Sequence, residues 1–205
     1  MMYITLGIIG TAGRKDDAKR LTKDTYQMML EKAVMTIQDL NHRHYHVDEL
    51  VSGGAAWSDH IAVSLFRRKI VKKLTLCLPS PWNSSAVQFV DSVLLPDHGC
   101  DANTANYYHR QFSKVVGFDS LAQLDQAIAS PGCTTIVGNG FKARNSEIAK
   151  RADAILAMTF GSGHTVKPRS GTADTMRKWR KLHTDEPDLS YHLDLHTIEC
   201  FRKAA

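Results

Sequence analysis

Residues 49–60 read ELVSGGAAWSDH, a strand-like run that stops at Ser52 and is followed by two adjacent glycines. A short apolar step comes next, and Asp59 stands where a helix is expected to begin. Glycine has no side chain, so a glycine pair lets the backbone bend and approach a bound group closely. Helix N-termini attract anions. This stretch therefore predicts a strand–turn–helix unit whose turn contacts a ligand such as a phosphate or a ribose.

Strand-like and helix-like segments alternate on both sides of this stretch. Strands are predicted at residues 2–10, 47–52, 73–79, 153–160 and 190–198, with the last strand at a sheet edge. Helices are predicted at about 21–40, 57–69, 143–151 and 171–183, with Ser52 or Ser58 as the N-cap of the second helix. This order predicts an α/β fold with a Rossmann-like, mostly parallel sheet and helices on both faces.

The middle of the chain, from residue 79 to about 140, is less regular. We predict a helix at 86–95, a polar stretch at 96–112 and a second helix near 120–129. The segment is too short and too poor in apolar periodicity to form its own core. We therefore expect one domain over residues 1–205, with a covering insertion at about 79–140.

Composition and charge exclude several classes of protein. No apolar run approaches the roughly 20 residues that span a bilayer, and the N-terminus lacks the basic region and cleavage site of a signal peptide. The four cysteines form no CxxC pair, which favours free thiols in a reducing compartment. We expect a cytoplasmic protein with no membrane partner. The net charge of +5 permits an anionic ligand and does not by itself require nucleic acid.

Three loops rich in glycine and hydroxyl residues are predicted at the carboxyl ends of strands, at residues 10–14, 52–59 and 161–172. In open α/β sheets ligands bind at this edge, and each loop leads toward a helix N-terminus that favours an anion. One such loop is common at any tight βα turn, but three at one sheet edge indicate a pocket. Its predicted lining is Gly10, Thr11, Arg14, Gly53, Gly54, Asp59, Arg144, Asn145, Ser170, Gly171 and Thr172.

The residue types in this predicted pocket suggest chemical roles. Arg14 and Arg144 can each bind a phosphate through two parallel hydrogen bonds. Asp59 can accept hydrogen bonds from ribose hydroxyls, or it can be a first-turn carboxylate that the helix dipole favours. Asn145 can bond a base edge or cap its helix, and capping is favoured. Trp57 can stack on a base, although a core position is more common for such a residue.

Four blocks of the sequence resemble the SLOG superfamily of Rossmann-like proteins. They are GIIGTAGRKD at 7–16, VSGGAAWSDHIA at 51–62, ARNSEIAKRADAILAM at 143–158 and SGTADTMRKW at 170–179. The superfamily includes the "Lonely guy" phosphoribohydrolases, the DNA-processing protein DprA and small nucleotide binders of the YspA type. The resemblance covers most of the chain, is weakest in the middle segment, and implies a nucleotide ligand.

The resemblance to the phosphoribohydrolases implies a role for Arg144 but not a complete catalytic site. That group carries an arginine in a motif similar to FKARN, and a catalytic glutamate that corresponds to Thr175 in this chain. N-glycosidic cleavage passes through an oxocarbenium-like state that a carboxylate stabilises. Glu147 and Asp174 are the candidates to replace the missing carboxylate, and a solvated helix carboxylate is the simpler interpretation of each.

Three functions remain open. We favour a protein that binds or senses a nucleotide or a nucleotide-derived ligand, and we expect it to form a homo-oligomer. The second candidate is a nucleotide N-glycosidase. The third is a DprA-like binder of single-stranded DNA, in which the basic segment RKWRKLH at 177–183 follows a phosphate backbone. A solvated face of an amphipathic helix also explains this segment.

No metal and no other cofactor is predicted. His42, His44 and His46 alternate in the sequence and would lie on one face of a strand, as metal ligands can. No cysteine or carboxylate completes the set locally, so a polar connection between two elements is favoured. The sequence also contains no Walker loop and no Ser-His-Asp motif.

Overall fold

The main feature of the molecule is a parallel β-sheet. The computed structural model describes residues 1–91, 100–161, 170–184 and 189–197. Within these residues, six parallel strands form one sheet in the order β6-β3-β2-β1-β7-β8. The strands are Met2–Gly10 (β1), Tyr45–Ser52 (β2), Lys73–Leu78 (β3), Cys133–Val137 (β6), Ala154–Thr159 (β7) and Ser190–Asp194 (β8). The predicted α/β fold is confirmed, and the last strand lies at a sheet edge as predicted.

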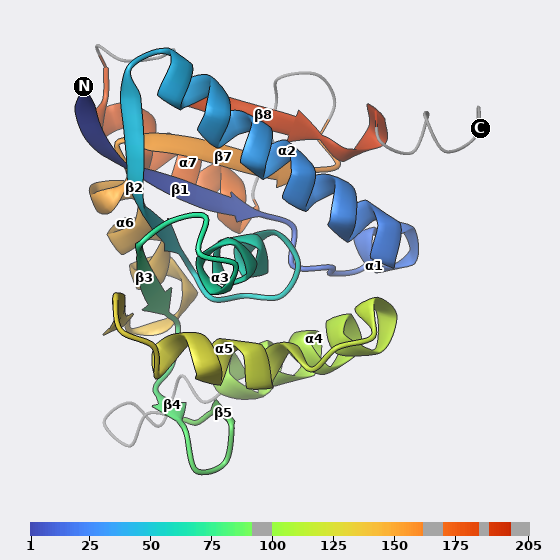
Figure 1. Cartoon of the computed structure of the whole chain (residues 1–205). Helices are drawn as coiled ribbons and strands as arrows, with labels where there is room; N and C mark the ends of the chain where they lie inside the picture. Colours follow the sequence, from blue (N-terminus) through green and yellow to red (C-terminus); the bar gives the residue numbers. More distant parts are fainter. Residues whose placement is uncertain (92–99, 162–169, 185–188, 198–205) are drawn as a thin grey trace.

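Helices cover both faces of this sheet. They are Asp17–Arg20 (α1), Lys23–His42 (α2), Ser58–Arg67 (α3), Cys100–Val116 (α4), Ser120–Ile128 (α5), Gly140–Arg151 (α6) and Gly171–Leu182 (α7). Figure 1 shows α2 and α3 on one face of the sheet and α6 and α7 on the other, with α4 and α5 beside α3. In the part of the chain that the structure describes, no helix is long and apolar enough to cross a membrane.

The central strands β1 and β7 are buried on both faces, as their apolar sequences predict. Every residue of β7 is buried, and so are the residues of β1 from Leu6 to Ile9. Burial of each large aliphatic side chain stabilises the fold by about 1.5–3 kcal/mol. Gly7 lets β1 approach the end of α6, because a Cβ atom there would lie 2.9 Å from the Cβ atom of Ala152. The loops at the carboxyl ends of these strands therefore start from a rigid base.

The predicted polar stretch at 96–112 is wrong in its described part, because residues 100–116 form the 17-residue helix α4. The buried face of α4 contains Phe112 and small alanines, but it also contains Asn106 and His109. These two polar residues interrupt the hydrophobic pattern by which a helix is recognised in a sequence. The predicted helix near 120–129 is confirmed as α5.

The predicted helix at 86–95 is also wrong where it is described, and residues 92–95 lie outside the described part. Gln88–Phe89 (β5) pairs antiparallel with Trp82–Asn83 (β4) to form a small hairpin. Asn106 holds this hairpin on α4, because it accepts a hydrogen bond from the Phe89 amide at 2.9 Å and donates one to the Phe89 carbonyl at 2.8 Å.

Strand β6 was not predicted, and it lies inside the segment expected to be a covering insertion. Its sequence CTTIV is only partly buried because it forms the other edge of the sheet. Edge strands lack the continuous apolar run of a central strand, so the sequence signal is weak. The middle segment therefore contributes both to the sheet and to its cover.

Helix α4 packs on the rest of the domain through a cluster of aromatic rings. The centroid of the Phe112 ring lies 4.7 Å from that of Trp57, 5.0 Å from that of Tyr26 and 5.3 Å from that of His60. Phe112 is fully buried. This packing fixes α4 next to the loop that follows β2.

Candidate functional site

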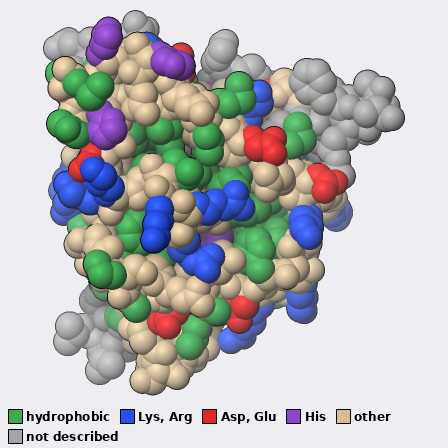
Figure 2. Space-filling model, viewed as in Figure 1, with side chains coloured by type: hydrophobic (Ala, Val, Ile, Leu, Met, Phe, Trp, Pro, Cys, Tyr) green, Lys and Arg blue, Asp and Glu red, His purple; other side chains and the backbone are tan. Residues whose placement is uncertain are grey.

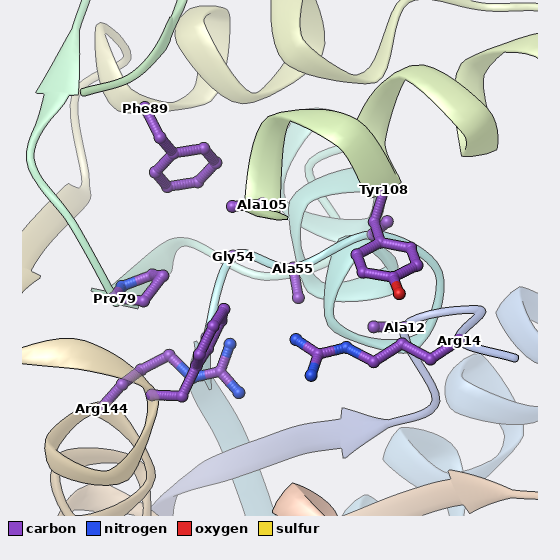
Figure 3. A pocket seen from close by; sticks show the side chains of 12 residues that line it. Ala12, Arg14, Gly54, Ala55, Pro79, Phe89, Ala105, Tyr108 and Arg144 are labelled. Carbon is purple, nitrogen blue, oxygen red and sulfur yellow. The ribbon is translucent and has the colours of Figure 1, made fainter. Parts of the chain in front are cut away.

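A pocket lies beside the carboxyl ends of β1 and β2, between the loops that follow these strands and helices α4 and α6 (Figure 3). Small residues, two arginines and three aromatic rings line it. These residues are Ala12, Arg14, Gly53, Gly54, Ala55, Ala56, Pro79, Phe89, Ala105, Tyr108, Phe141 and Arg144. The cavity has a volume of about 10 Å³, which is room for one water molecule. A larger ligand must therefore occupy the mouth of the pocket or displace a side chain.

Arg144 of α6 is the buried cation of this pocket. Its side chain is 12% exposed, and its Nη1 lies 3.7 Å from Oδ2 of Asp59, which is too long for a hydrogen bond. Its Nη2 donates to Oδ1 of Asn145 at 3.2 Å. Among the described residues, the buried Nε and Nη1 atoms of Arg144 have no hydrogen-bond partner. A buried donor without an acceptor costs about 1–3 kcal/mol, and more when it is charged.

The glycine pair of the loop after β2 makes this arginine–aspartate pair possible. A Cβ atom at Gly53 would lie 2.6 Å from Oδ2 of Asp59 and 2.8 Å from Cζ of Arg144. Gly54 has a φ of +64°, which residues with a side chain rarely adopt. The two glycines are therefore required by the ion pair and by the turn itself.

Asp59 is the counter-ion of Arg144. Its Oδ2 accepts a hydrogen bond from the Ala55 amide at 3.4 Å. Burial raises the pKa of Asp59, whereas Arg144 and the amides of Ala55 and Gly53 lower it. Burial likewise lowers the pKa of Arg144, and Asp59 opposes this shift. Asp59 is not one of the residues that line the pocket, so it supports the site from behind Arg144.

Arg14 closes the pocket from the opposite side. Figure 3 shows Arg14 and Arg144 extending toward each other, one from the loop after β1 and the other from α6. The guanidinium carbon of Arg14 lies 5.2 Å from the ring centroid of Tyr108 and 5.0 Å from that of Phe141. The guanidinium carbon of Arg144 lies 5.3 Å from the Phe141 centroid. Two cations and two aromatic rings therefore converge on one small cavity.

His109 of α4 holds the glycine loop in place. It is fully buried, and its Nε2 lies 2.9 Å from the carbonyl oxygen of Gly54. A carbonyl only accepts, so Nε2 carries the proton, and Nδ1 accepts from the Ser120 hydroxyl at 3.0 Å. Burial lowers the pKa of His109 to about 4. The neutral imidazole thus links the loop after β2 to α4 and α5.

Three predicted residues join the loops instead of lining the pocket. The hydroxyl of Thr172 donates to the carbonyl of Gly10 at 3.0 Å, which connects the start of α7 to the end of β1. The hydroxyl of Thr11 donates to Asp17 at 2.7 Å and accepts from the Gly13 amide at 3.1 Å. These bonds set the shape of the loop at residues 10–14.

The third predicted loop is only partly described. Ser170 caps α7, because its hydroxyl accepts a hydrogen bond from the Ala173 amide at 3.0 Å. Residues 162–169 lie outside the described part, so the prediction for this loop stays a prediction. Gly171 is the first residue of α7, and its carbonyl accepts from the side chain of Asn145 at 3.3 Å.

The predicted helix caps are wrong. Asn145 lies inside α6, and its side chain also donates to Asp174 at 3.3 Å, so it joins α6 to α7. Residue Trp57 occupies the N-cap of α3 and is buried, as its favoured core interpretation predicts. Ser52 donates to the carbonyl of Asp59, and Ser58 donates to the carbonyl of Met158, so neither serine caps α3.

Sequence reasoning missed the aromatic part of the pocket. Phe141 stands three residues before Arg144, so helical spacing alone places both on one face of α6. Tyr108 could not be found, because α4 was not predicted. Phe89 was assigned to a helix and in fact belongs to the small hairpin.

The candidate catalytic carboxylates do not line the pocket. Glu147 forms ion pairs with Lys150 at 3.3 Å and Arg151 at 3.5 Å on the same helix. Asp174 pairs with Arg177 and with Lys178, the latter at 2.7 Å. Thr175 is buried and donates its hydroxyl to the carbonyl of Gly171 at 3.1 Å, inside α7.

Basic residues lie on two surfaces other than the pocket, one on α7, which carries the basic segment at 177–183, and one beside α3. On α7, Trp179 is fully buried and donates to the carbonyl of Ala152 at 2.8 Å, so its ring is not available for stacking on a base. Figure 2 shows Lys and Arg side chains together near the centre of the face where α3 is seen end-on in Figure 1. Arg67, Arg68 and Lys69 are exposed at the end of this helix.

Metal ligands and reactive thiols are not found in the described residues. No group of three or more His, Cys, Asp or Glu in the described ranges is placed to hold a metal ion. Cys77 and Cys133 are free, and burial raises their thiol pKa values to about 12 and about 11, respectively. Both thiols are therefore protonated and weakly nucleophilic at neutral pH.

Comparison with known proteins gives one viral relative. The chain is 34% identical to the uncharacterized protein R261 of Acanthamoeba polyphaga mimivirus over 200 residues, which cover 94% of this chain and 100% of that protein. No protein-family model matches the chain. The match therefore extends over nearly all of this chain and is not confined to one part of the fold.

Proposed function

We propose that this chain, which belongs to the same family as the mimivirus protein R261, binds a nucleotide whose phosphate group contacts Arg144. The ligand-binding region is the pocket at the carboxyl ends of β1 and β2. This is the edge of an open α/β sheet where ligands usually bind.

One observation supports this proposal most strongly: the Nε and Nη1 atoms of Arg144 are buried and have no acceptor in the described part of the chain. A protein that needed only a folded core would gain little from a buried ion pair here, because apolar residues in place of both partners are often as stable or more stable. An anion in the pocket would give one of these donors an acceptor, and a phosphate oxygen does so through a short, charge-assisted hydrogen bond. The cavity of about 10 Å³ has room for one such oxygen atom.

The surroundings of Arg144 favour a phosphate over a neutral ligand. Arg14 adds a second positive charge at the mouth of the pocket. Asp59 neutralises only part of this charge, since it lies behind Arg144 and already accepts from the Ala55 amide. Aromatic rings beside both guanidinium groups suit a ligand that carries a flat base.

Binding without cleavage fits the pocket better than N-glycosidic hydrolysis does. Among the residues that line the described pocket there is no carboxylate. Glu147 and Asp174 are engaged in ion pairs on α6 and α7. A carboxylate is needed to stabilise the oxocarbenium-like transition state of that reaction.

Calorimetry with the four common ribonucleoside 5′-monophosphates tests this proposal. At least one should bind, and the matching nucleoside, which lacks the phosphate, should bind at least tenfold more weakly. Arg144→Met should weaken nucleotide binding by about 1.5–3 kcal/mol, the worth of a charge-assisted hydrogen bond. Arg68→Met, which changes an exposed arginine after α3, is the matched control and should have no effect. Equal affinities for nucleotide and nucleoside would contradict the proposal.

A further inference from the structure

Arg14 occupies a position that its own contacts only weakly favour. The side chain is exposed, and in the described part of the chain it makes no hydrogen bond and no ion pair. It is held only by the faces of Tyr108 and Phe141, at 5.2 Å and 5.0 Å from its guanidinium carbon. Cation–aromatic contacts of this kind are weak when the cation is exposed to water.

The two rings are fixed much better than the arginine between them. Tyr108 belongs to α4, which the buried Phe112 and His109 anchor to the domain. Phe141 belongs to the first turn of α6. Both rings are half-buried, so each presents one part of its surface to the pocket mouth. When Arg14 moves, an apolar surface formed by two rings becomes accessible.

The size of the cavity shows where the rest of a nucleotide has to lie. About 10 Å³ beside Arg144 accepts a phosphate oxygen but not a ribose or a base. The Phe141 centroid lies 5.3 Å from the guanidinium carbon of Arg144. A base on Phe141 and a phosphate at Arg144 are therefore within the span of a single nucleotide.

We propose that the rings of Tyr108 and Phe141 form the subsite for the nucleobase, and that Arg14 leaves this position on binding and pairs with the phosphate. This inference rests on the proposed function. Stacking of a base on aromatic rings is stronger than the contact it replaces, and a phosphate is a better partner for a guanidinium than an aromatic face. The exchange therefore favours a phosphate and a base on the same molecule. It places no requirement on which base is bound, since every base has a stacking face.

The test compares ligands with and without a base. Calorimetry is performed with ribose 5-phosphate and with the ribonucleoside 5′-monophosphate that binds best. Tyr108→Leu and Phe141→Leu should each lower the affinity for the nucleotide at least tenfold. Neither variant should change the affinity for ribose 5-phosphate by more than about twofold. Arg14→Met should weaken both ligands. The control is Tyr3→Leu, which changes an exposed tyrosine near the amino end of β1 that does not line the pocket and should change neither affinity.

Two different failures are distinguishable. If neither ligand binds, or if Arg144→Met changes nothing, the proposed function is wrong. If both ligands bind with equal affinity and the two leucine variants match the unchanged protein, only the base subsite is wrong. A nuclear Overhauser effect between the base protons and the Tyr108 ring protons of the unchanged protein tests the subsite directly, without any variant. Its presence supports the subsite and its absence in the bound complex overturns it.

Discussion

Replacing Arg144 by methionine should destabilise the protein, and the reason can be worked out from the structure. Asp59 has a side chain that is 6% exposed and lies 3.7 Å from the guanidinium. Two unit charges at this distance attract each other by about 4–5 kcal/mol at an effective dielectric constant near 20. Removing one partner of such a buried pair typically costs about 3–5 kcal/mol, because the other charge stays buried without compensation. We expect a loss of about 3 kcal/mol in the free energy of unfolding.

Removing both charges should restore most of this loss. In the double variant Arg144→Met with Asp59→Asn, an asparagine oxygen can still accept from the Ala55 amide, which donates to Asp59 at 3.4 Å. The two buried arginine donors that lack acceptors are also gone. Buried ion pairs can often be replaced by neutral groups at little cost. The free energy of unfolding of the double variant should therefore lie within about 1 kcal/mol of that of the unchanged protein, although the variant should still bind nucleotide more weakly.

The single variant should also have a distinctive dependence on pH. Burial raises the pKa of Asp59, and the loss of Arg144 removes the main opposing charge. The folded protein then binds this proton more tightly than the unfolded chain does. Relative to that of the unchanged protein, its free energy of unfolding should rise as the pH falls from 7 toward 5, because protonation removes the buried charge of Asp59. The double variant contains no carboxyl group at residue 59 and should lack this rise.

Urea titration followed by circular dichroism at 25 °C measures the free energy of unfolding of the unchanged protein, of Arg144→Met and of the double variant. Arg68→Met, which changes an exposed arginine, is the control. Equal slopes against urea would show that the variants unfold from comparable folded states. If Arg144→Met is as stable as the unchanged protein, or if the double variant is no more stable than Arg144→Met, then Arg144 and Asp59 are not coupled as described. The assignment of the pocket would then lose its electrostatic basis.

Three other outcomes are expected. Burial lowers the pKa of His60 to about 3 and the pKa of His109 to about 4, so the unfolded chain binds protons at these histidines more tightly than the folded protein does. The free energy of unfolding should therefore fall by about 2 kcal/mol for each histidine as the pH falls from 6.5 to 4.5. A free energy of unfolding that stays constant over this range in urea titrations would contradict this prediction. His109→Gln keeps a donor for the glycine loop and should retain more nucleotide affinity in calorimetry than His109→Leu, whereas equal affinities would show that His109 does not position the loop. Chromatography should detect no rapid release of base from nucleoside monophosphates; release that is lost in Glu147→Gln or Asp174→Asn would establish the N-glycosidase instead.

The part of the fold that could be predicted is the part with a regular hydrophobic pattern. The apolar runs of β1, β3 and β7 identify buried parallel strands, because both faces of such strands contact helices. Helix α4 could not be predicted, since Asn106 and His109 occupy buried positions where a helix normally shows apolar residues. Their hydrogen-bond partners, Phe89 and Gly54, are distant in the sequence and only the folded chain reveals them.

The residues of the candidate site also fall into a group that could be predicted from the sequence and a group that could not. Arg14, Gly53, Gly54 and Arg144 were predicted and line one pocket, because loops at the ends of adjacent parallel strands must meet at one sheet edge. The role of Gly53 could not be predicted, since it depends on Asp59 and Arg144 meeting across the loop. The place of Tyr108 in the pocket could not be predicted either, because this residue belongs to α4, which was not predicted.

A crystal structure of the complex with the best-binding ribonucleoside 5′-monophosphate tests the central claim most directly. We expect a phosphate oxygen within hydrogen-bond distance of Nε or Nη1 of Arg144, the two atoms that are buried without a partner in the described part of the chain. A nucleotide bound elsewhere, with these two atoms still unpaired, would contradict the claim that Arg144 is the phosphate-binding residue.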